Sequence, residues 1–465
     1  MKIPVVTVLV PLIVGCAQFM QQLDSTIIAT ALPVIADSLK EEPLRLNLAI
    51  TSYLLSLAVF LPISGWMTDR FGTRTVFASA MAVFTLGSML CGLADSLLFL
   101  VAARIIQGAG GAMMLPVGRM IILKTVPKEA LVSAMNWVTI PGVLGPLLGP
   151  PLGGFIVTYF SWRWIFFMNL PVGLLGIALI CVFVRNIREP GVHRLDLAGF
   201  LMVGVGLACL VFGFTTMGRG LLPLSTVIWL LIVGSAASLA YLVYATRAAA
   251  PLLDLKMLKV PSFRAGIVGG GLFYMGATAV PFLLALLFQL GFGLTPVESG
   301  VMTLAVALGS VCTRFSLTRL LRRFGFRTVT IAGALLHALC LLACVLFHVG
   351  TPYALILLTL FPMGFARSVT YTSLNSLPYI EMQPSVMSRA QSFASMAQQL
   401  FGSFGVGLTA LIAHGSLLLR GGAEIRPSDL APAFLIIGLL CAASLFSFLR
   451  LPADIGADVS GRSRG

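Results

Sequence analysis

The stretch DRFGTRTV occupies residues 69–76, and RRFGFRTV occupies residues 322–329. Six of the eight positions are identical, and the two copies begin 253 residues apart. Each copy is a short basic segment around a central glycine, and each lies between two long apolar runs. A turn repeated in this way predicts that the chain folds as two related halves.

The composition predicts the environment of the chain. Of its 465 residues 58% are hydrophobic and 10% are charged, and the mean hydropathy is +1.01. Soluble domains carry about 25% charged residues, and only lipid can surround so much apolar surface. The net charge of +14 does not indicate nucleic-acid binding, because the basic residues lie in short loops between apolar runs. We therefore expect a lipid bilayer as partner and no nucleic acid.

The cysteines and the N-terminus each require an interpretation. All eight cysteines fall in apolar runs, which is typical of buried hydrophobic residues rather than disulfides. His337, Cys340, Cys344 and His348 share one helix face, but four residues in line cannot surround a metal tetrahedrally. The segment ending in IVGC at Cys16 is similar to a lipoprotein cleavage signal, yet its apolar run continues, so we expect an uncleaved first helix.

Apolar runs of about 20 residues, the length that crosses a bilayer, recur along the chain with helical rather than alternating periodicity. Fourteen transmembrane helices are predicted, near residues 5–34, 47–67, 75–94, 98–123, 134–158, 163–184, 196–217, 224–245, 264–289, 297–317, 328–348, 352–377, 389–414 and 430–450.

The charges of the loops predict the orientation. With a cytoplasmic N-terminus, 21 of the 30 Lys and Arg residues fall on the inner side, 6 on the outer side, and Arg104, Arg119 and Arg367 within spans. This bias follows the positive-inside rule and predicts an even number of spans with both termini in the cytoplasm.

The spacing of the repeated turn predicts the domain organisation. Six spans with short loops need about 200 residues, so the observed spacing leaves room for two more helices. We predict an all-α membrane protein with a 6 + 2 + 6 arrangement: an N-terminal six-helix bundle (1–190), two additional helices with a linker (191–262) and a C-terminal six-helix bundle (263–465). Two parallel six-helix repeats are a transporter architecture, with substrate near the midplane.

Four motifs extend this interpretation: LDSTIIATALP (23–33), GWMTDRFGTRTV (65–76), RIIQGAGGAMMLPVGR (104–119) and GPLLGPPLGGFI (145–156). Together they resemble the major facilitator superfamily, in its fourteen-helix drug:proton antiporter branch, the EmrB/QacA subfamily. The second half matches mainly through its topology and RRFGFRTV. The resemblance implies a major facilitator fold, alternating access, proton-coupled export of small drug-like compounds and a location in the bacterial inner membrane. We expect a monomer with no cofactor and no metal.

Two ionisable residues within spans are candidates for proton coupling. Asp24 and Arg104 both lie in the outer half of their predicted helices, where a charge costs at least ~2.5 kcal/mol on insertion scales. Desolvation opposes the charged carboxylate and a nearby arginine favours it, which suits a group that gains and loses a proton. A static ion pair is the alternative. Ala29 departs from the family, in which an asparagine is common at this position.

Four further polar residues within spans are predicted to form a substrate cavity: Gln21, Arg119, Arg367 and Asn375. Arg367 lies near the midplane of its span, and structural hydrogen bonding is the alternative to substrate contact there. Two or three arginines against one carboxylate favour anionic, zwitterionic or neutral solutes over cations.

Two motifs are candidates for gating. Gly65, Asp69, Arg70, Gly72 and Arg74 belong to the first, which the resemblance identifies as a cytoplasmic gate; a basic loop that fixes topology is the alternative. The second copy has Arg322 where the first has Asp69. Small residues and prolines form the second motif, in which we expect close helix packing and a bend that controls conformational change: Gly145, Gly149, Pro150, Gly153 and Gly154.

Enzyme motifs do not appear in the sequence. It lacks a GxxxxGK[ST] phosphate loop, and GAGGA (108–112) lies inside a predicted helix. An ion gradient is then the expected energy source. The alternatives to drug export are an exporter of organic anions or metal chelates, and a membrane sensor or scaffold without transport.

Overall fold

A computed structural model describes residues 5–41, 43–127, 130–190, 194–217, 222–248, 251–383, 386–421, 426–452 and 455. These residues contain helices and no strand, as the helical periodicity predicts. The first half consists of α1 (Val10–Leu39), α2 (Pro43–Phe60), α3 (Ser64–Phe71), α4 (Thr73–Gly92), α5 (Leu97–Thr125), α6 (Leu131–Tyr159), α7 (Trp164–Phe167) and α8 (Asn169–Phe183).

The rest of the chain continues as helices. They are α9 (Leu197–Thr216), α10 (Leu224–Arg247), α11 (Pro261–Arg264), α12 (Gly270–Ala285), α13 (Pro296–Phe324), α14 (Phe326–Ala343), α15 (Tyr353–Leu374), α16 (Met387–Arg420) and α17 (Pro427–Leu449). Short π and 3-10 turns extend several of them, such as the π turn Ala265–Gly269 between α11 and α12.

The helix lengths bear on the predicted number of spans. Within the described residues, eleven helical segments are long and apolar enough to cross a membrane, or twelve if the bent pair Glu298–Thr313 and Ser316–Phe324 is one span. Further helices, α1 and α6, cover two more of the predicted spans with 30 and 29 residues. The order of helices is compatible with fourteen spans, and that count and the predicted domain boundaries stay predictions.

The repeated turn has the same backbone conformation in both copies. Gly72 ends α3 and begins α4 with φ 93° and ψ 152°, and Gly325 joins α13 to α14 with φ 81° and ψ 163°. The Gly72 amide donates to Thr68 O at 2.9 Å, and the Gly325 amide donates to Leu321 O at 2.9 Å. Residues with a side chain rarely adopt this φ, so the two glycines are required by the turn itself.

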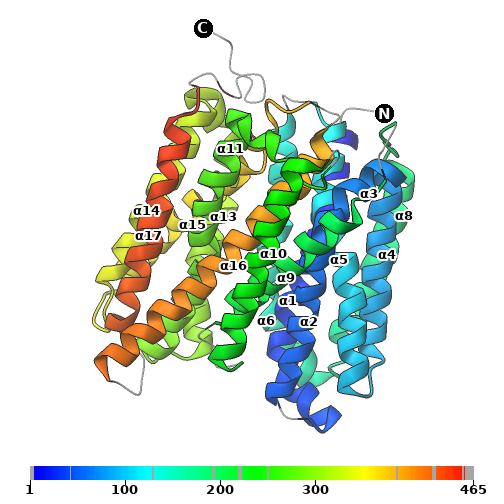
Figure 1. The fold of residues 1–465 in the computed structure, drawn as a ribbon. Coiled ribbons are helices and arrows are strands. Elements are labelled where there is room, and N and C mark those ends of the chain that lie inside the picture. The colour runs from blue at the N-terminus through cyan, green and yellow to red at the C-terminus, as the bar shows by residue number, and fades with distance from the viewer. Residues whose placement is uncertain are drawn as a thin grey trace. The chain divides into compact units, whose positions relative to one another are not determined.

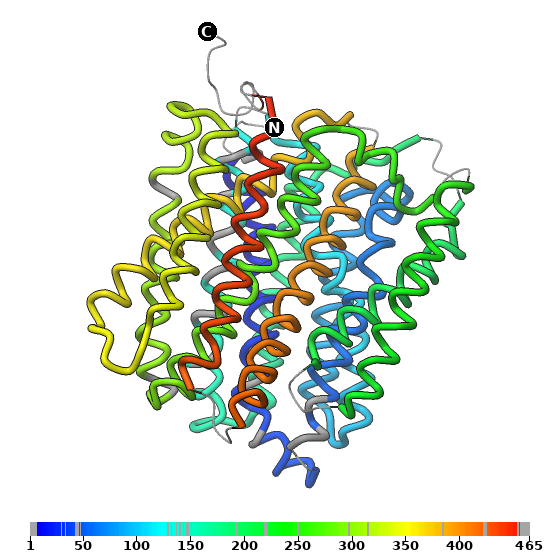
Figure 2. Tube along the Cα trace, turned by 60° about the vertical axis from the view of Figure 1, so that its left-hand side comes forward, coloured from blue at the N-terminus to red at the C-terminus, as the bar shows by residue number. Residues whose placement is uncertain are grey.

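Two compact units can be described separately. The first comprises residues 1–212, 233–255 and 383–396, and the second comprises residues 213–232, 256–382 and 397–465. In the first unit α1 packs along α6, and α5 packs against both α2 and α4 (Figure 1). Helix α4 also contacts α8. In the second unit α15 packs against α13 and α14, and α17 packs against α12 and α14 (Figure 2, α14 and α15 in yellow tones).

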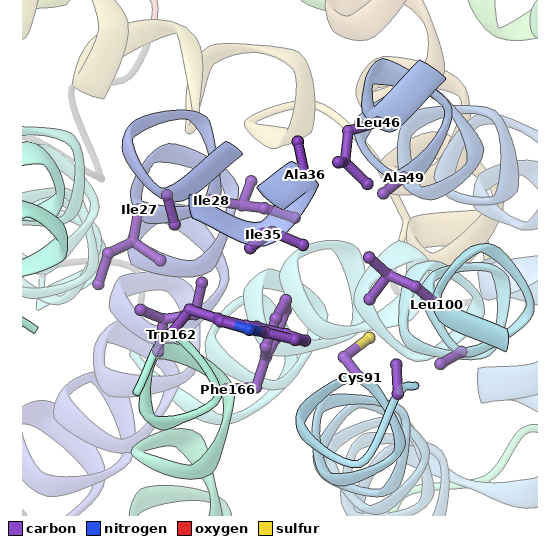
Figure 3. Packing of buried hydrophobic residues seen from close by; sticks show 14 residues of the cluster. Ile27, Ile28, Ile35, Ala36, Leu46, Ala49, Cys91, Leu100, Trp162 and Phe166 are labelled. Carbon is purple, nitrogen blue, oxygen red and sulfur yellow. The ribbon is translucent and has the colours of Figure 1, made fainter. Parts of the chain in front are cut away.

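A cluster of buried apolar side chains fills one end of the first unit. Ile27, Ile28, Ile35 and Ala36 of α1 meet residues of α2, α4, α5 and α7 (Figure 3). The other labelled members are Leu46, Ala49, Cys91, Leu100, Trp162 and Phe166. Ile27 and Ile28 follow Asp24 by about one helical turn. The cluster therefore lies next to the Asp24 carboxylate, toward the C-terminal end of α1.

Candidate functional site

The structure brings Asp24 of α1 and Arg104 of α5 together. Arg104 Nη1 lies 2.6 Å from Asp24 Oδ2, and both side chains are 0% exposed. Such a short contact between an arginine and a carboxylate is a charge-assisted hydrogen bond. Complete burial makes removal of either partner costly, because an unpaired charge would remain inside the protein.

Two amides complete the environment of the Asp24 carboxylate. Gln107 Nε2 donates to Asp24 Oδ1 at 2.8 Å, and Asn169 Nδ2 donates to the same oxygen at 3.3 Å. Asn169 also donates to Ser88 Oγ at 3.0 Å, and the Ser88 hydroxyl donates to Phe166 O at 2.9 Å. The carboxylate on α1 is therefore held by α5 and α8, with α4 behind α8.

The Arg104 guanidinium has further partners besides Asp24. Its Nε donates to Ala49 O at 3.1 Å, and its Nη1 also donates to Gln107 Oε1 at 2.7 Å. The guanidinium carbon lies 4.2 Å from the centre of the Tyr53 ring, a cation–π contact. These contacts do not depend on Asp24, so the arginine keeps acceptors whatever the charge of the carboxylate.

The predicted substrate-cavity residues fall into two places. Gln21 lies one turn before Asp24 and is 8% exposed, and Arg119 is buried on α5, both in the first unit. Arg367 lies inside α15 and Asn375 caps that helix, both in the second unit. Their common role as a cavity stays a prediction.

Glycines of α6 lie directly against α1 beside Asp24. A Cβ at Gly145 would lie 2.7 Å from Gln22 Cβ, one at Gly149 would overlap Thr26 Oγ1, and one at Gly153 would lie 2.9 Å from Ile27 Cγ1. Gly154 points elsewhere, because a Cβ there would meet nothing within 4 Å. The close packing thus involves three of the four predicted glycines, and α1 is the partner helix.

The predicted bend in α6 depends on its prolines. The backbone of α6 runs as one helix from Leu131 to Tyr159 through Pro150, whose side chain lies outside the described residues. The bend therefore stays a prediction.

The 69–76 turn is bound to the segment that follows α8. Asn186 Oδ1 accepts hydrogen bonds from the amides of Arg74 and Thr75 at 3.1 and 3.3 Å, and a Cβ on Gly72 would overlap that oxygen. Arg188 Nε donates to Phe71 O at 3.0 Å. Gly72 is therefore required both by its φ and by the close approach of Asn186.

The charged residues of the first gating motif have different surroundings. Asp69 Oδ1 lies 3.6 Å from Lys124 Nζ, which in turn lies 2.7 Å from Glu189 Oε1. These groups connect α3, α5 and the segment after α8. Arg70 and Arg74 instead have exposed side chains.

Gly65 permits a close contact between α3 and the start of α16. A Cβ on Gly65 would lie 2.6 Å from both Ser388 O and Ser392 Oγ. The neighbouring Ser64 hydroxyl lies 2.9 Å from the Ser392 hydroxyl. These residues all belong to the first unit, so part of α16 packs on the same end of the bundle as the 69–76 turn.

Several residues of these contacts were not predicted from the sequence. Gln107 stands one turn after Arg104, and that spacing could have identified it. Asn169, Asn186 and Glu189 come from distant segments and carry no local signal. Within the described residues, no group of three or more His, Cys, Asp or Glu side chains could hold a metal ion.

Comparisons with known proteins decide the family. The model of the Major Facilitator Superfamily matches residues 14–406. The chain belongs to the major facilitator superfamily. This confirms the resemblance of the four motifs, and it makes the protein a transporter rather than an enzyme.

Similar proteins support the same assignment. The chain is 37% identical over 451 residues to MdtD of Escherichia coli (strain K12), and 38% identical over 451 residues to MdtD of Yersinia enterocolitica serotype O:8 / biotype 1B (strain NCTC 13174 / 8081). The names of both relatives describe a role in multidrug resistance. Each alignment covers 96% of this chain and 95% of the relative. Major facilitators bind small-molecule substrates within the membrane, and these relatives indicate a multi-pass protein of the bacterial inner membrane.

Solved structures share the fold at low sequence identity. The human organic anion transporter MFSD10 (TETRAN) has a TM-score of 0.66 at 16% identity, over 96% of this chain and 98% of that one. The proton:xylose symporter XylE bound to 6-bromo-6-deoxy-D-glucose has a TM-score of 0.67 at 16% identity, over 96% of both chains. The major facilitator fold predicted from the motifs is therefore confirmed.

Proposed function

We propose that the protein exports small drug-like organic compounds in exchange for protons, by alternating access, as a monomer with both termini in the cytoplasm. The observation that carries the proposal is the fully buried Asp24, which accepts hydrogen bonds from Arg104, Gln107 and Asn169. A charged residue within a span is energetically costly, and such residues usually have a function. The relatives to which multidrug resistance is ascribed support drug-like compounds as the cargo.

Asp24 is the proposed proton carrier because its surroundings suit both protonation states. As a carboxylate it has an arginine and two amide donors. When it gains a proton, the Asp24–Arg104 ion pair is lost, but Arg104 keeps Ala49 O, Gln107 Oε1 and the Tyr53 ring. Protonation leaves the Arg104 charge without a counter-charge, but these two acceptors and the ring still solvate it, which lowers the cost of that state.

The proton site is proposed to act on conformation through α1. This helix carries Asp24, packs on the glycines of α6 and contributes to the apolar cluster of Figure 3. Protonation weakens the attachment of α1 to α5 and α8 on one face, while the α6 contact on another face is unchanged. We expect α1 to tilt along the glycine surface when the proton binds, and the 69–76 turn is the proposed cytoplasmic gate.

Asp24→Asn tests the proposal, because it preserves the size of the side chain and removes the titratable group. Purified protein is reconstituted in proteoliposomes, and efflux of the cationic dye ethidium and of the anion 1-naphthoate is measured with and without a pH gradient. We expect the gradient to accelerate efflux by wild type and not by the variant, with binding of the compounds retained. Asp95→Asn, at an exposed carboxylate after α4, is the matched control and should behave as wild type.

Two outcomes would contradict the proposal. Gradient-driven efflux at the wild-type rate by Asp24→Asn would place the proton elsewhere. Absence of flux of either compound in well-folded wild type, with binding intact, would favour the sensor or scaffold alternative.

A further inference from the structure

The second unit holds a cationic side chain deep within a helix, with no hydrogen-bonding or ion-pair partner among the residues that the structure describes. Arg367 follows the first residue of α15 by fourteen positions, or about 21 Å at 1.5 Å per residue. Its neighbours Ala366 and Ser368 are 1% and 5% exposed, whereas Arg367 itself is partly exposed. Within the described residues Arg367 forms no hydrogen bond and no ion pair, in contrast to Arg104.

The carboxylates that the structure describes in this unit are engaged elsewhere. Glu298 accepts hydrogen bonds from Thr295 at the start of α13, and Glu381 accepts one from the amide of Ser262. Asp429 pairs with Arg420 at 2.8 Å. No described acidic side chain of the second unit therefore neutralises Arg367, although an isolated charge at this depth is costly.

An aromatic residue with a hydroxyl group lies near the Arg367 guanidinium. Tyr371 lies one turn after Arg367, on the same face of α15, and is also partly exposed. Its hydroxyl oxygen accepts a hydrogen bond from Gln398 Nε2, which leaves the hydroxyl proton able to donate. The Tyr274 ring of α12 meets the Tyr371 ring edge-on, with centroids 5.3 Å apart.

We propose that Arg367, Tyr371 and Tyr274 form a binding site for an aromatic carboxylate. The guanidinium supplies two parallel donors to the carboxylate, and the Tyr371 hydroxyl supplies a third. The partly exposed Tyr371 ring, held edge-on by the buried Tyr274 ring, packs against the aromatic part of the solute. The inference names the substrate class of the proposed exporter and in that sense rests on the proposed function. The binding chemistry itself requires only the side chains of this unit.

Three solutes of nearly the same shape isolate the effect of charge: 1-naphthoate, 1-naphthylmethanol and 1-naphthylmethylammonium. Binding to the full chain in neutral detergent, without anionic lipid, is measured by equilibrium dialysis. We expect wild type to bind naphthoate tighter than the alcohol, and the ammonium weakest. Arg367→Ala should weaken naphthoate binding about 10- to 100-fold, the range for a hydrogen-bonded charged group, and should leave the alcohol within about twofold.

Conservative variants separate the guanidinium geometry from charge alone. Arg367→Lys keeps the charge without the planar pair of donors, so naphthoate affinity should fall between wild type and Arg367→Ala. Tyr371→Phe should weaken naphthoate and spare the alcohol, because only the donor is lost. Arg322→Lys, at an exposed arginine of α13, is the control and should match wild type.

Several results would overturn the site. One is that wild type binds naphthoate no tighter than the alcohol. The others are that monodisperse Arg367→Ala loses equal affinity for all three solutes, or that it keeps its naphthoate affinity unchanged. Phosphatidylglycerol that displaces naphthoate at equal concentration would assign the arginine to a lipid headgroup instead. Asp24→Asn should keep the naphthoate preference, so a failure of proton coupling is distinguishable from a failure of this site.

Discussion

Two identical glycine-to-alanine substitutions on α6 should have clearly different effects on stability. Gly149 and Gly154 both lie on α6, five residues apart, but a Cβ at Gly149 would overlap Thr26 Oγ1 and lie 2.9 Å from Thr26 Cβ. A Cβ at Gly154 would meet nothing within 4 Å. The pair therefore compares close packing on α1 with free space, in the same helix and with the same change.

The magnitudes follow from two opposing contributions. Replacing a helical glycine by alanine stabilises the folded state by about 1 kcal/mol through helix propensity. Overpacking costs about 1–3 kcal/mol, and only Gly149→Ala incurs it. We expect Gly154→Ala to be stabilised by about 1 kcal/mol, and Gly149→Ala to lie about 1–3 kcal/mol below it. The order is measured as midpoints of thermal unfolding of purified protein in detergent.

Thr26→Ala provides the internal check. The Thr26 hydroxyl donates only to carbonyls of its own helix, Gln22 O at 3.0 Å and Leu23 O at 3.1 Å, so its removal leaves no donor unpaired. Combined with Gly149→Ala it should restore part of the lost stability, because the Oγ1 overlap is removed while the Cβ contact at 2.9 Å remains, a non-additive effect expected of residues in contact. If Gly149→Ala is as stable as Gly154→Ala, or if Thr26→Ala restores nothing, α1 and α6 do not meet as described.

Two further predictions concern the buried pair and the topology. Arg104→Met should destabilise by about 3–5 kcal/mol because it leaves a buried carboxylate unpaired, and addition of Asp24→Asn should recover most of the loss in the same thermal assay; an equally unstable double variant would contradict this. In a cysteine-free background, a cysteine placed at Lys40 should react with an impermeant maleimide added outside. A cysteine placed at Arg188 should react only when the maleimide is added inside. Labelling of both from one side would refute the proposed orientation.

The sequence predicted most of the fold because membrane helices are encoded locally. Apolar length, charged or glycine-containing ends and the repeated turn all lie within short windows, and each had a clear physical meaning. The identical φ and ψ regions of Gly72 and Gly325 show that the repeat was structural as well as compositional. Exact helix ends were less predictable, since α1 continues to Leu39 and α16 to Arg420, beyond the predicted ends at residues 34 and 414.

The candidate site was predictable only in part. Asp24 and Arg104 could be proposed as partners because a charge inside an apolar run is conspicuous. Gln107 and Asn169 are neutral, so their presence on the carboxylate depends on the packing of α1 against α5 and α8, which one sequence does not specify. The same is true of Asn186, which binds the 69–76 turn from more than a hundred residues away.

The contrast between Arg104 and Arg367 has a consequence for energetics. Arg104 is balanced by Asp24, whereas Arg367 has no described carboxylate to balance it and is proposed to bind an anion. Each elementary charge that crosses the membrane gains or loses about 2.3 kcal/mol per 100 mV. If one proton enters for each monovalent anion that leaves, both movements follow the potential, and 100 mV would contribute about 4.6 kcal/mol per cycle. A monovalent cation exported for one proton moves no net charge and gains nothing from the potential. If Asp24 carries the proton and Arg367 binds the anion, as proposed, the membrane potential should drive anion export even without a pH gradient.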